Sequence, residues 1–195
     1  MSYIVLLDSS NTSLSVGLAK ESVLIDSISY EAWPEQSEKM IPELDKMLLN
    51  NKVNKDEITS VIVSIGPGSY TGVRIAITIA KVMATALKCE IKPVSSLRVL
   101  KENDKPSICL INARSNRSYI GVYQDDKVIL EDQIMNNDEV KEYISSHPSY
   151  SVCGNVKYLD IDGYQANICE QMLLLNKSLT AIENPMALKP TYMKD

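Results

Sequence analysis

The stretch Gly66-Pro67-Gly68-Ser69-Tyr70-Thr71-Gly72-Val73-Arg74 decides how this chain of 195 residues can fold. It follows the apolar run 61–65 and precedes a long apolar pattern over 70–88, so it predicts a strand, a tight glycine loop and a helix start. Backbone amides at a helix start can cradle an anion. The stretch matches neither GxxxxGKS/T nor GxGxxG, and a turn that needs glycine only for its shape explains it equally well.

The composition is that of an ordinary globular protein, with 45% hydrophobic and 23% charged residues. The net charge of −5 argues against nucleic acid as an autonomous partner, because phosphate binding depends on clustered Lys and Arg. No cysteines form a CxxC pair, which suits reduced thiols in the cytosol. We expect no apolar run long enough to span a membrane and read residues 3–7 as a strand, so we expect a cytoplasmic protein without membrane contact.

Hydrophobic periodicity predicts an α/β protein with two lobes. Expected strands cover residues 3–8, 13–19, 22–30, 59–65, 91–94, 107–112, 118–124, 127–132 and 150–153. Expected helices cover residues 36–50, 70–88, 137–146 and 165–176, with a short helix from Ser95 or Ser96 to Leu100. The polar stretch 102–106 is the expected hinge between an N-terminal lobe, 1–102, and a shorter C-terminal lobe, 103–195. Both halves open with strands, which indicates a duplicated unit.

The helix expected over 70–88 is apolar on two faces. One stripe consists of Val73, Ala76, Ile77, Ala80, Met83, Ala84 and Leu87. The other consists of Ile75, Ile79, Val82 and Ala86, and at 100° per residue it lies roughly 130° around the helix. One face should meet the sheet of its own lobe. The second face is covered either by the helix over 36–50 or by a partner protein, and the pattern alone leaves both open.

The glycine stretch resembles the GPGSYTGVR signature of the TsaB (YeaZ) family. Four other segments are similar to motifs of that family: Leu7–Val16 to LDTSTxxLSV, Ser37–Pro42 to HSExLLP, Asn112–Arg114 with Tyr119 to DARxxEVY, and Pro190–Tyr192 to a closing P-x-Y. The resemblance covers nearly the whole chain. It implies the ASKHA fold class of actin, Hsp70 and acetate kinase, which is RNase H-like and built from two lobes.

The resemblance also implies a function and partners. It implies a non-catalytic subunit that binds a TsaD-like ATPase, which transfers threonylcarbamoyl to N6 of adenosine 37 in ANN-reading tRNAs. A TsaE-like ATPase joins the larger complex, and tRNA is met only indirectly. The helices over 36–50 and 70–88 would pair with equivalent helices of the partner, or of a second copy in a homodimer. The interface candidates are Met40, Leu44, Met47, Ile75, Ile79 and Val82.

Two alternatives retain an enzymatic activity. A small ASKHA ATPase or kinase would use Asp8 with the loop 66–72, and Asp8, Ser9 and Ser10 are the expected vestigial nucleotide site. A structural carboxylate at the strand end is at least as good an explanation.

A metallopeptidase would need a metal pair, and the TsaD-like ATPases carry HxxxH where this chain has Ser96 and Leu100. Leucine cannot bind a metal, so we expect no catalytic residue, no metal and no cofactor.

At three positions the family motifs have an ionisable residue and this chain has a different residue. Gln36 replaces a histidine, and Asn112 and Arg117 replace the Asp and Glu of DARxxEVY, which weakens any catalytic claim further. The sequence ends soon after Tyr192, which leaves open how complete the second lobe is. Whether the loop binds an anion also stays open. The expected motif-loop residues are Gly66, Pro67, Gly68, Ser69, Tyr70, Thr71, Gly72 and Arg74.

Overall fold

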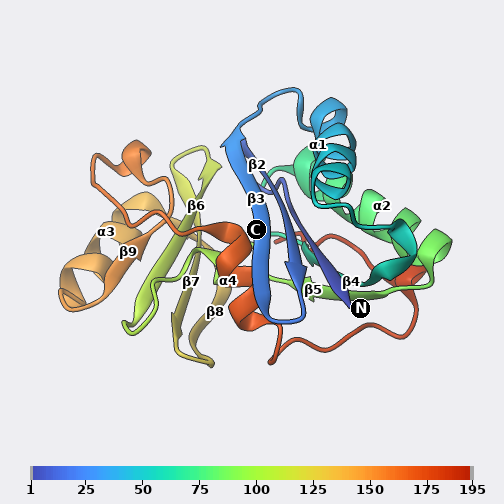
Figure 1. Ribbon diagram of the computed structural model, residues 1–195. Coiled ribbons are helices and arrows are strands. Elements are labelled where there is room, and N and C mark those ends of the chain that lie inside the picture. The colour runs from blue at the N-terminus through green and yellow to red at the C-terminus, as the bar shows by residue number, and fades with distance from the viewer. Residues whose placement is uncertain (1, 194–195) are drawn as a thin grey trace.

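The structure, a computed structural model, describes residues 2–193 and contains two β-sheets that lie side by side (Figure 1). The first sheet has the order β3-β2-β1-β4-β5 and consists of β1 (Tyr3–Asp8), β2 (Ser13–Lys20), β3 (Val23–Glu31), β4 (Ile58–Ser64) and β5 (Glu90–Val94). β1, β4 and β5 are parallel, whereas β2 and β3 continue the sheet as antiparallel hairpins. The carboxyl ends of β1 and β4 therefore meet at one edge, where the glycine loop begins.

The second sheet repeats the order of the first four strands. It has the order β8-β7-β6-β9 and consists of β6 (Ser107–Arg114), β7 (Arg117–Gln124), β8 (Lys127–Asn136) and β9 (Ser151–Cys153). Strand β9 pairs in parallel with β6 after the helix α3 (Asn137–Ser146), as β4 pairs with β1 after a helix. The duplication that the sequence indicated is confirmed at the level of topology.

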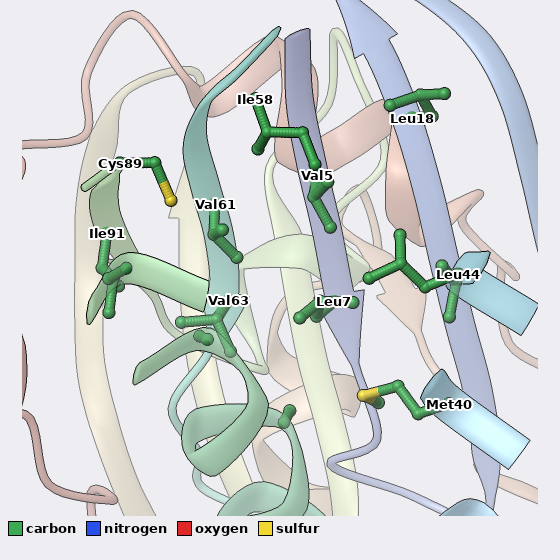
Figure 2. Close-up of a cluster of buried hydrophobic side chains, with 14 of the residues drawn as sticks. Val5, Leu7, Leu18, Met40, Leu44, Ile58, Val61, Val63, Cys89 and Ile91 are labelled. Atoms are coloured by element: carbon green, nitrogen blue, oxygen red, sulfur yellow. The ribbon is translucent and has the colours of Figure 1, made fainter. Parts of the chain in front are cut away.

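Two helices cover one face of the first sheet. They are α1 (Gln36–Asn50) and α2 (Tyr70–Leu87). Val5 and Leu7 of β1 point toward Met40 and Leu44 of α1 in one continuous apolar cluster (Figure 2). Because side chains alternate along a strand, the residues between them face the opposite side of the sheet. That second apolar face also needs a cover, since exposed apolar area is costly in water.

The cover for the second face comes from the far end of the chain. Helix α4 (Ile168–Leu175) packs its Cys169 and Met172 against Ile4 and Leu6 of β1, and it lies between the two sheets in Figure 1. The following segment returns to β5, where the Ile182 amide donates to the Ile91 carbonyl at 3.0 Å. A division at residue 102 therefore separates the sheets, but the expected lobe 103–195 is not self-contained.

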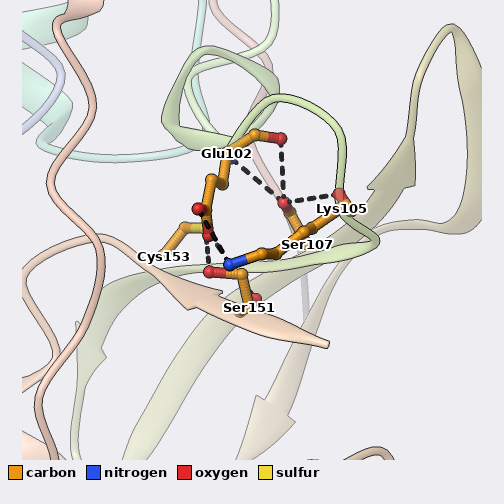
Figure 3. Close-up of polar contacts among 5 residues, drawn as sticks. All are labelled: Glu102, Lys105, Ser107, Ser151 and Cys153. Atoms are coloured by element: carbon orange, nitrogen blue, oxygen red, sulfur yellow. Dashed lines mark hydrogen bonds and ion pairs between the residues drawn. The ribbon is translucent and has the colours of Figure 1, made fainter. Parts of the chain in front are cut away.

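The expected hinge at 102–106 is a hydrogen-bonded turn (Figure 3). The Oγ of buried Ser107 accepts from the Glu102 amide at 3.0 Å and donates to the Lys105 carbonyl at 3.1 Å. The Lys105 Nζ lies 3.2 Å from the Glu102 carboxylate. Ser151 and Cys153 of β9 lie beside this turn in Figure 3. The connection between the sheets is thus tied to the second sheet by polar contacts.

The short helix expected before residue 100 is a single 3-10 turn over Arg98–Leu100. Its entry is capped as the sequence suggested, because the Ser95 Oγ accepts from the amides of Leu97 at 3.1 Å and Arg98 at 3.3 Å. Helix α4 begins at Ile168, three residues later than the expected start at 165, since the side chain of Asn167 caps it. The other expected elements are found within a few residues of their predicted ends.

Helix α2 corrects one expectation. It spans 18 residues with a hydropathy of 1.3, so by length and composition alone it is apolar enough to cross a membrane. We had expected no such run. The stripe that includes Val73, Ala76 and Ala80 is buried in the cluster above the first sheet, and α2 packs on β4. A core helix has this composition because it buries a wide apolar face.

The packing of α4 on the first sheet can be tested with a pair of variants of one helix. Met172→Ala should lower the free energy of unfolding by about 2–5 kcal/mol, because removal of this fully buried side chain leaves a cavity in the core. Leu174→Ala is the matched control, since Leu174 is 60% exposed and its loss should cost much less. Urea unfolding followed by circular dichroism measures both. Equal effects would contradict the assignment of α4 to the core of the first sheet.

Candidate functional site at the glycine loop and the α1/α2 face

The glycine loop docks against the turn between β1 and β2. The Ser69 amide donates to the Ser10 carbonyl at 2.6 Å, and the Ser9 hydroxyl donates to the Gly72 carbonyl at 2.8 Å. Ser69 also caps α2, its Oγ accepting from the Gly72 amide at 3.2 Å. Two amides that could have faced an anion at the start of α2 therefore have partners within the chain.

Glycine is required in this loop because two backbones approach closely. A β-carbon at Gly72 would overlap the Ser9 carbonyl oxygen, and one at Gly68 would overlap the Ser10 carbonyl oxygen. Gly68 also has a φ of +154°, which disfavours any side chain. The shape explanation that the sequence left open is thus sufficient for these two glycines.

Asp8, Ser9 and Ser10, the expected vestigial nucleotide site, lie together at the end of β1, and all three are buried. The Asp8 carboxylate accepts from the Ser10 amide at 3.2 Å and from the Ser10 hydroxyl at 2.9 Å. Burial raises the pKa of Asp8, and the hydrogen bonds from Ser10 offset part of that rise. The carboxylate is therefore engaged by its own turn, which suits a structural group.

Ser96, which the resemblance aligns with a histidine of the TsaD-like ATPases, has a structural use. Ser96 is buried, its Oγ accepts from the Gly66 amide at 3.0 Å, and its own amide donates to the Gly66 carbonyl at 2.9 Å. Ser96 thus fixes the entry of the glycine loop. Across residues 2–193, the structure brings together no group of three or more His, Cys, Asp or Glu side chains that could hold a metal ion.

A partly buried polar cluster joins the two sheets, and sequence reasoning missed it. The Asp132 carboxylate of β8 accepts hydrogen bonds from the Ser95 hydroxyl, after β5, and from the Tyr123 hydroxyl of β7. Burial raises the pKa of both Asp132 and Tyr123, in the latter case reinforced by the charge of Asp132. No local pattern could have paired these residues, because they come from three separate segments.

A cleft of about 450 Å³ opens in front of the first turn of α2. Its lining is mixed, with hydroxyl, amide and aromatic groups, a single cationic side chain and no carboxylate. The residues that line it are Asn11, Thr12, Trp33, Ser69, Tyr70, Thr71, Ile111, Asn112 and Arg114. This set supplies neither a general base nor a metal ligand of the usual kinds.

An apolar groove of about 340 Å³ runs between α1 and α2. Ile41 and Val82 line it and remain 50% and 62% exposed, while Ile79 is half-buried at its side. The second stripe of α2 is therefore only partly covered by α1. The interface candidates on α1 need correction, because Met40 and Met47 are buried against the sheet of their own chain and do not line the groove. Leu44 lines the groove but is itself buried.

The close approach at Gly72 predicts a large effect from one methyl group. Gly72→Ala should lower the free energy of unfolding by about 1–3 kcal/mol or more, because the loop must shift away from the Ser9 carbonyl. Thr71→Ala, an exposed neighbour in the same turn, should change it by about 0.5 kcal/mol or less. Thermal unfolding of the two variants makes the comparison, and a silent Gly72→Ala would contradict the described contact.

Asp8 predicts a pH dependence of stability. Its pKa is raised above the ordinary value of 3.8 in the folded chain, so the unfolded chain releases this proton first as the pH rises. Stability from Asp8 is then full below pH 3.8 and is lost as the pH rises through the folded pKa. Relative to wild type, Asp8→Asn should gain free energy of unfolding as the pH rises above 3.8 in urea titrations. If the variant instead loses free energy of unfolding relative to wild type as the pH rises, the folded chain favours the ionised carboxylate of Asp8 and the prediction is wrong.

Comparisons with known proteins agree on one family. The family model described as "TsaD: tRNA N6-adenosine threonylcarbamoyltransferase" matches residues 30–149. Two curated relatives are named "tRNA threonylcarbamoyladenosine biosynthesis protein TsaB". The one from Bacillus subtilis is 33% identical over 66% of this chain and 58% of its own length. The one from Buchnera aphidicola subsp. Schizaphis graminum is 33% identical over 67% of this chain and 65% of its own length. The match thus spans less than two thirds of each relative.

The fold agrees over a longer range. The solved structure of "YeaZ from Pseudomonas aeruginosa" superposes with a TM-score of 0.84 at 21% identity, covering 99% of this chain and 100% of that one. This likeness shows that the two proteins share a fold, and the expected ASKHA, RNase H-like class is confirmed. The chain therefore belongs to the protein family that this model describes and, within it, to the TsaB (YeaZ) proteins.

Proposed function

We propose that this chain is a non-catalytic subunit of tRNA threonylcarbamoyladenosine biosynthesis that binds a TsaD-like ATPase through α1 and α2. The partner would carry out the transfer to adenosine 37 of ANN-reading tRNAs, with a TsaE-like ATPase in the larger complex. This chain would meet tRNA only through that complex, in the cytoplasm. The observation that carries the proposal is the apolar groove between α1 and α2, with Ile41 and Val82 exposed at its rim.

The exposed strip of α2 suits another helix. Thr78, Val82, Thr85 and Ala86 are exposed and small to medium in size, and α2 contains no Asp or Glu. Small side chains let two helices approach closely, and exposed apolar side chains beside a groove are typical of interaction sites. When the partner is absent, the same surface supports a homodimer, because a two-fold interface pairs one patch with itself.

The glycine loop supports a non-catalytic role. Asp8 is hydrogen-bonded within its own turn, and the Ser69 amide donates a hydrogen bond to the Ser10 carbonyl. Ser96, at the position of a metal ligand in the TsaD-like ATPases, holds the backbone of Gly66. No observation of this kind favours the ATPase or kinase alternative. That alternative predicts ATP binding by the isolated chain and its loss in Asp8→Asn.

Charges placed in the groove should prevent pairing. Ile41→Glu combined with Val82→Glu should abolish co-purification with the TsaD-like protein of the same cell, because two carboxylates would be desolvated in an apolar contact. These positions suit the test better than Ile75 and Ile79, which also pack on the core and are partly buried. Size-exclusion chromatography with light scattering measures the assemblies.

Leu49→Glu is the matched control. Leu49 is 78% exposed on α1 and is not among the residues that line the groove, so a glutamate at this position should leave pairing with the partner intact. Circular dichroism establishes that all variants keep the fold. If the folded double variant still binds the partner, the groove is not the binding surface. If the wild-type chain does not bind the partner at all, the proposed function is wrong.

A further inference from the structure

The side chain of Arg74 is held in place by two tyrosines. Its guanidinium carbon lies 3.9 Å from the ring centre of Tyr70, and its Nε donates to the Tyr192 hydroxyl at 2.6 Å. The two tyrosine rings stack with their centres 5.3 Å apart and their planes 25° from parallel. An exposed arginine normally samples many rotamers, so this arrangement removes part of the entropy cost of using it in a contact.

Tyr192 is placed by the segment of residues 182–192, here called the C-terminal strap. Leu188 of the strap is buried in the cluster of α1 and α2, and the Met186 carbonyl accepts from Lys81 Nζ at 3.1 Å. The Thr191 amide then donates to the Ile65 carbonyl, at the end of β4, at 2.7 Å. The strap therefore brings Tyr192 to the first turn of α2 through contacts with the core.

Arg74 has no carboxylate to pair with in the described part of the chain. No ion pair of Arg74 is found among residues 2–193, and α2 has no acidic residue. A guanidinium carries five N–H donors, and the contact with Tyr192 uses only the one at Nε. The others, on an exposed side chain, are available to a ligand with a planar pair of oxygens.

The position of Arg74 continues the exposed strip of α2. Arg74, Thr78 and Val82 follow one another at a spacing of four residues, so they lie along the same side of the helix. Arg74 thus stands at the N-terminal end of that strip, with Val82, which lines the groove, two turns further on. Arginine and tyrosine beside an apolar centre are the composition typical of protein-interface hot spots.

We propose that Arg74, positioned by Tyr192 of the C-terminal strap, is a preformed anchor for a carboxylate of the TsaD-like partner. This inference rests on the proposed function and names one contact within that interface. A protein carboxylate is favoured over an RNA phosphate because α2 carries just two cations, Arg74 and Lys81, and Lys81 already donates to the Met186 carbonyl. The chain as a whole has a net charge of −5. RNA binding depends on several clustered cations.

The test measures the affinity of the full chain for the purified TsaD-like protein by calorimetry at two salt concentrations. Arg74→Gln should weaken binding about tenfold and flatten the salt dependence, because the charge pair is lost. Arg74→Lys should keep the salt dependence but recover only part of the affinity, since an ammonium lacks the planar fork. Tyr192→Phe keeps the ring and should weaken binding about threefold through loss of orientation alone.

Lys46→Gln is the control for net charge, because Lys46 is an exposed cation on α1 outside the groove lining. If Arg74→Gln changes the affinity for the partner no more than Lys46→Gln does, while the Ile41/Val82 double variant abolishes binding, then Arg74 is not an anchor and the proposed function stands. If Arg74→Gln spares partner affinity but lowers tRNA binding by the complex, Arg74 contacts a phosphate and the proposal is overturned. A wild-type chain without affinity for the partner overturns both proposals.

Discussion

The close contact between the glycine loop and the turn after β1 determines much of the rest of the structure. Because the carbonyls of Ser9 and Ser10 occupy the space beside Gly72 and Gly68, the start of α2 is fixed relative to the end of β1. The direction of α2 then follows from its buried stripe on β4. The groove against α1 and the position of Arg74 are consequences of that placement, so one contact in the backbone sets the geometry of the proposed partner surface.

The polar groups at the end of the first sheet serve the fold. In this chain the Asp8 carboxylate has a partner in its own turn, and the Ser96 hydroxyl and the Ser69 amide each have one in a neighbouring loop. Buried polar groups need such partners because an unsatisfied one costs more than its hydrogen bond would contribute. A loop built this way is stiff, which suits a surface that must be presented to another protein in one orientation.

Periodicity predicted the elements well and their partners less well. The helix over 36–50 was predicted with the ends that it has, because its apolar spacing is regular and Trp33-Pro34 precedes it. The same spacing could not tell that Met40 and Met47 face the sheet of their own chain and leave Ile41 outside. Nor could it place α4 on β1, or join Ser95 to Asp132, since both depend on contacts between distant segments. The ranges of the strands and helices and the motif loop were accessible from sequence, whereas burial on each side was not.

The return of the chain to the first sheet has a consequence for synthesis on the ribosome. The face of β1 that carries Ile4 and Leu6 is covered by α4, and the cluster on the other side includes Leu188. The first sheet therefore leaves the exit tunnel without its full cover, and its core closes only after α4 and Leu188 have emerged. Domains generally fold as units in the order of synthesis. Here β1 must wait for α4, which leaves an apolar sheet face open to chaperones until residues 168–175 have been translated.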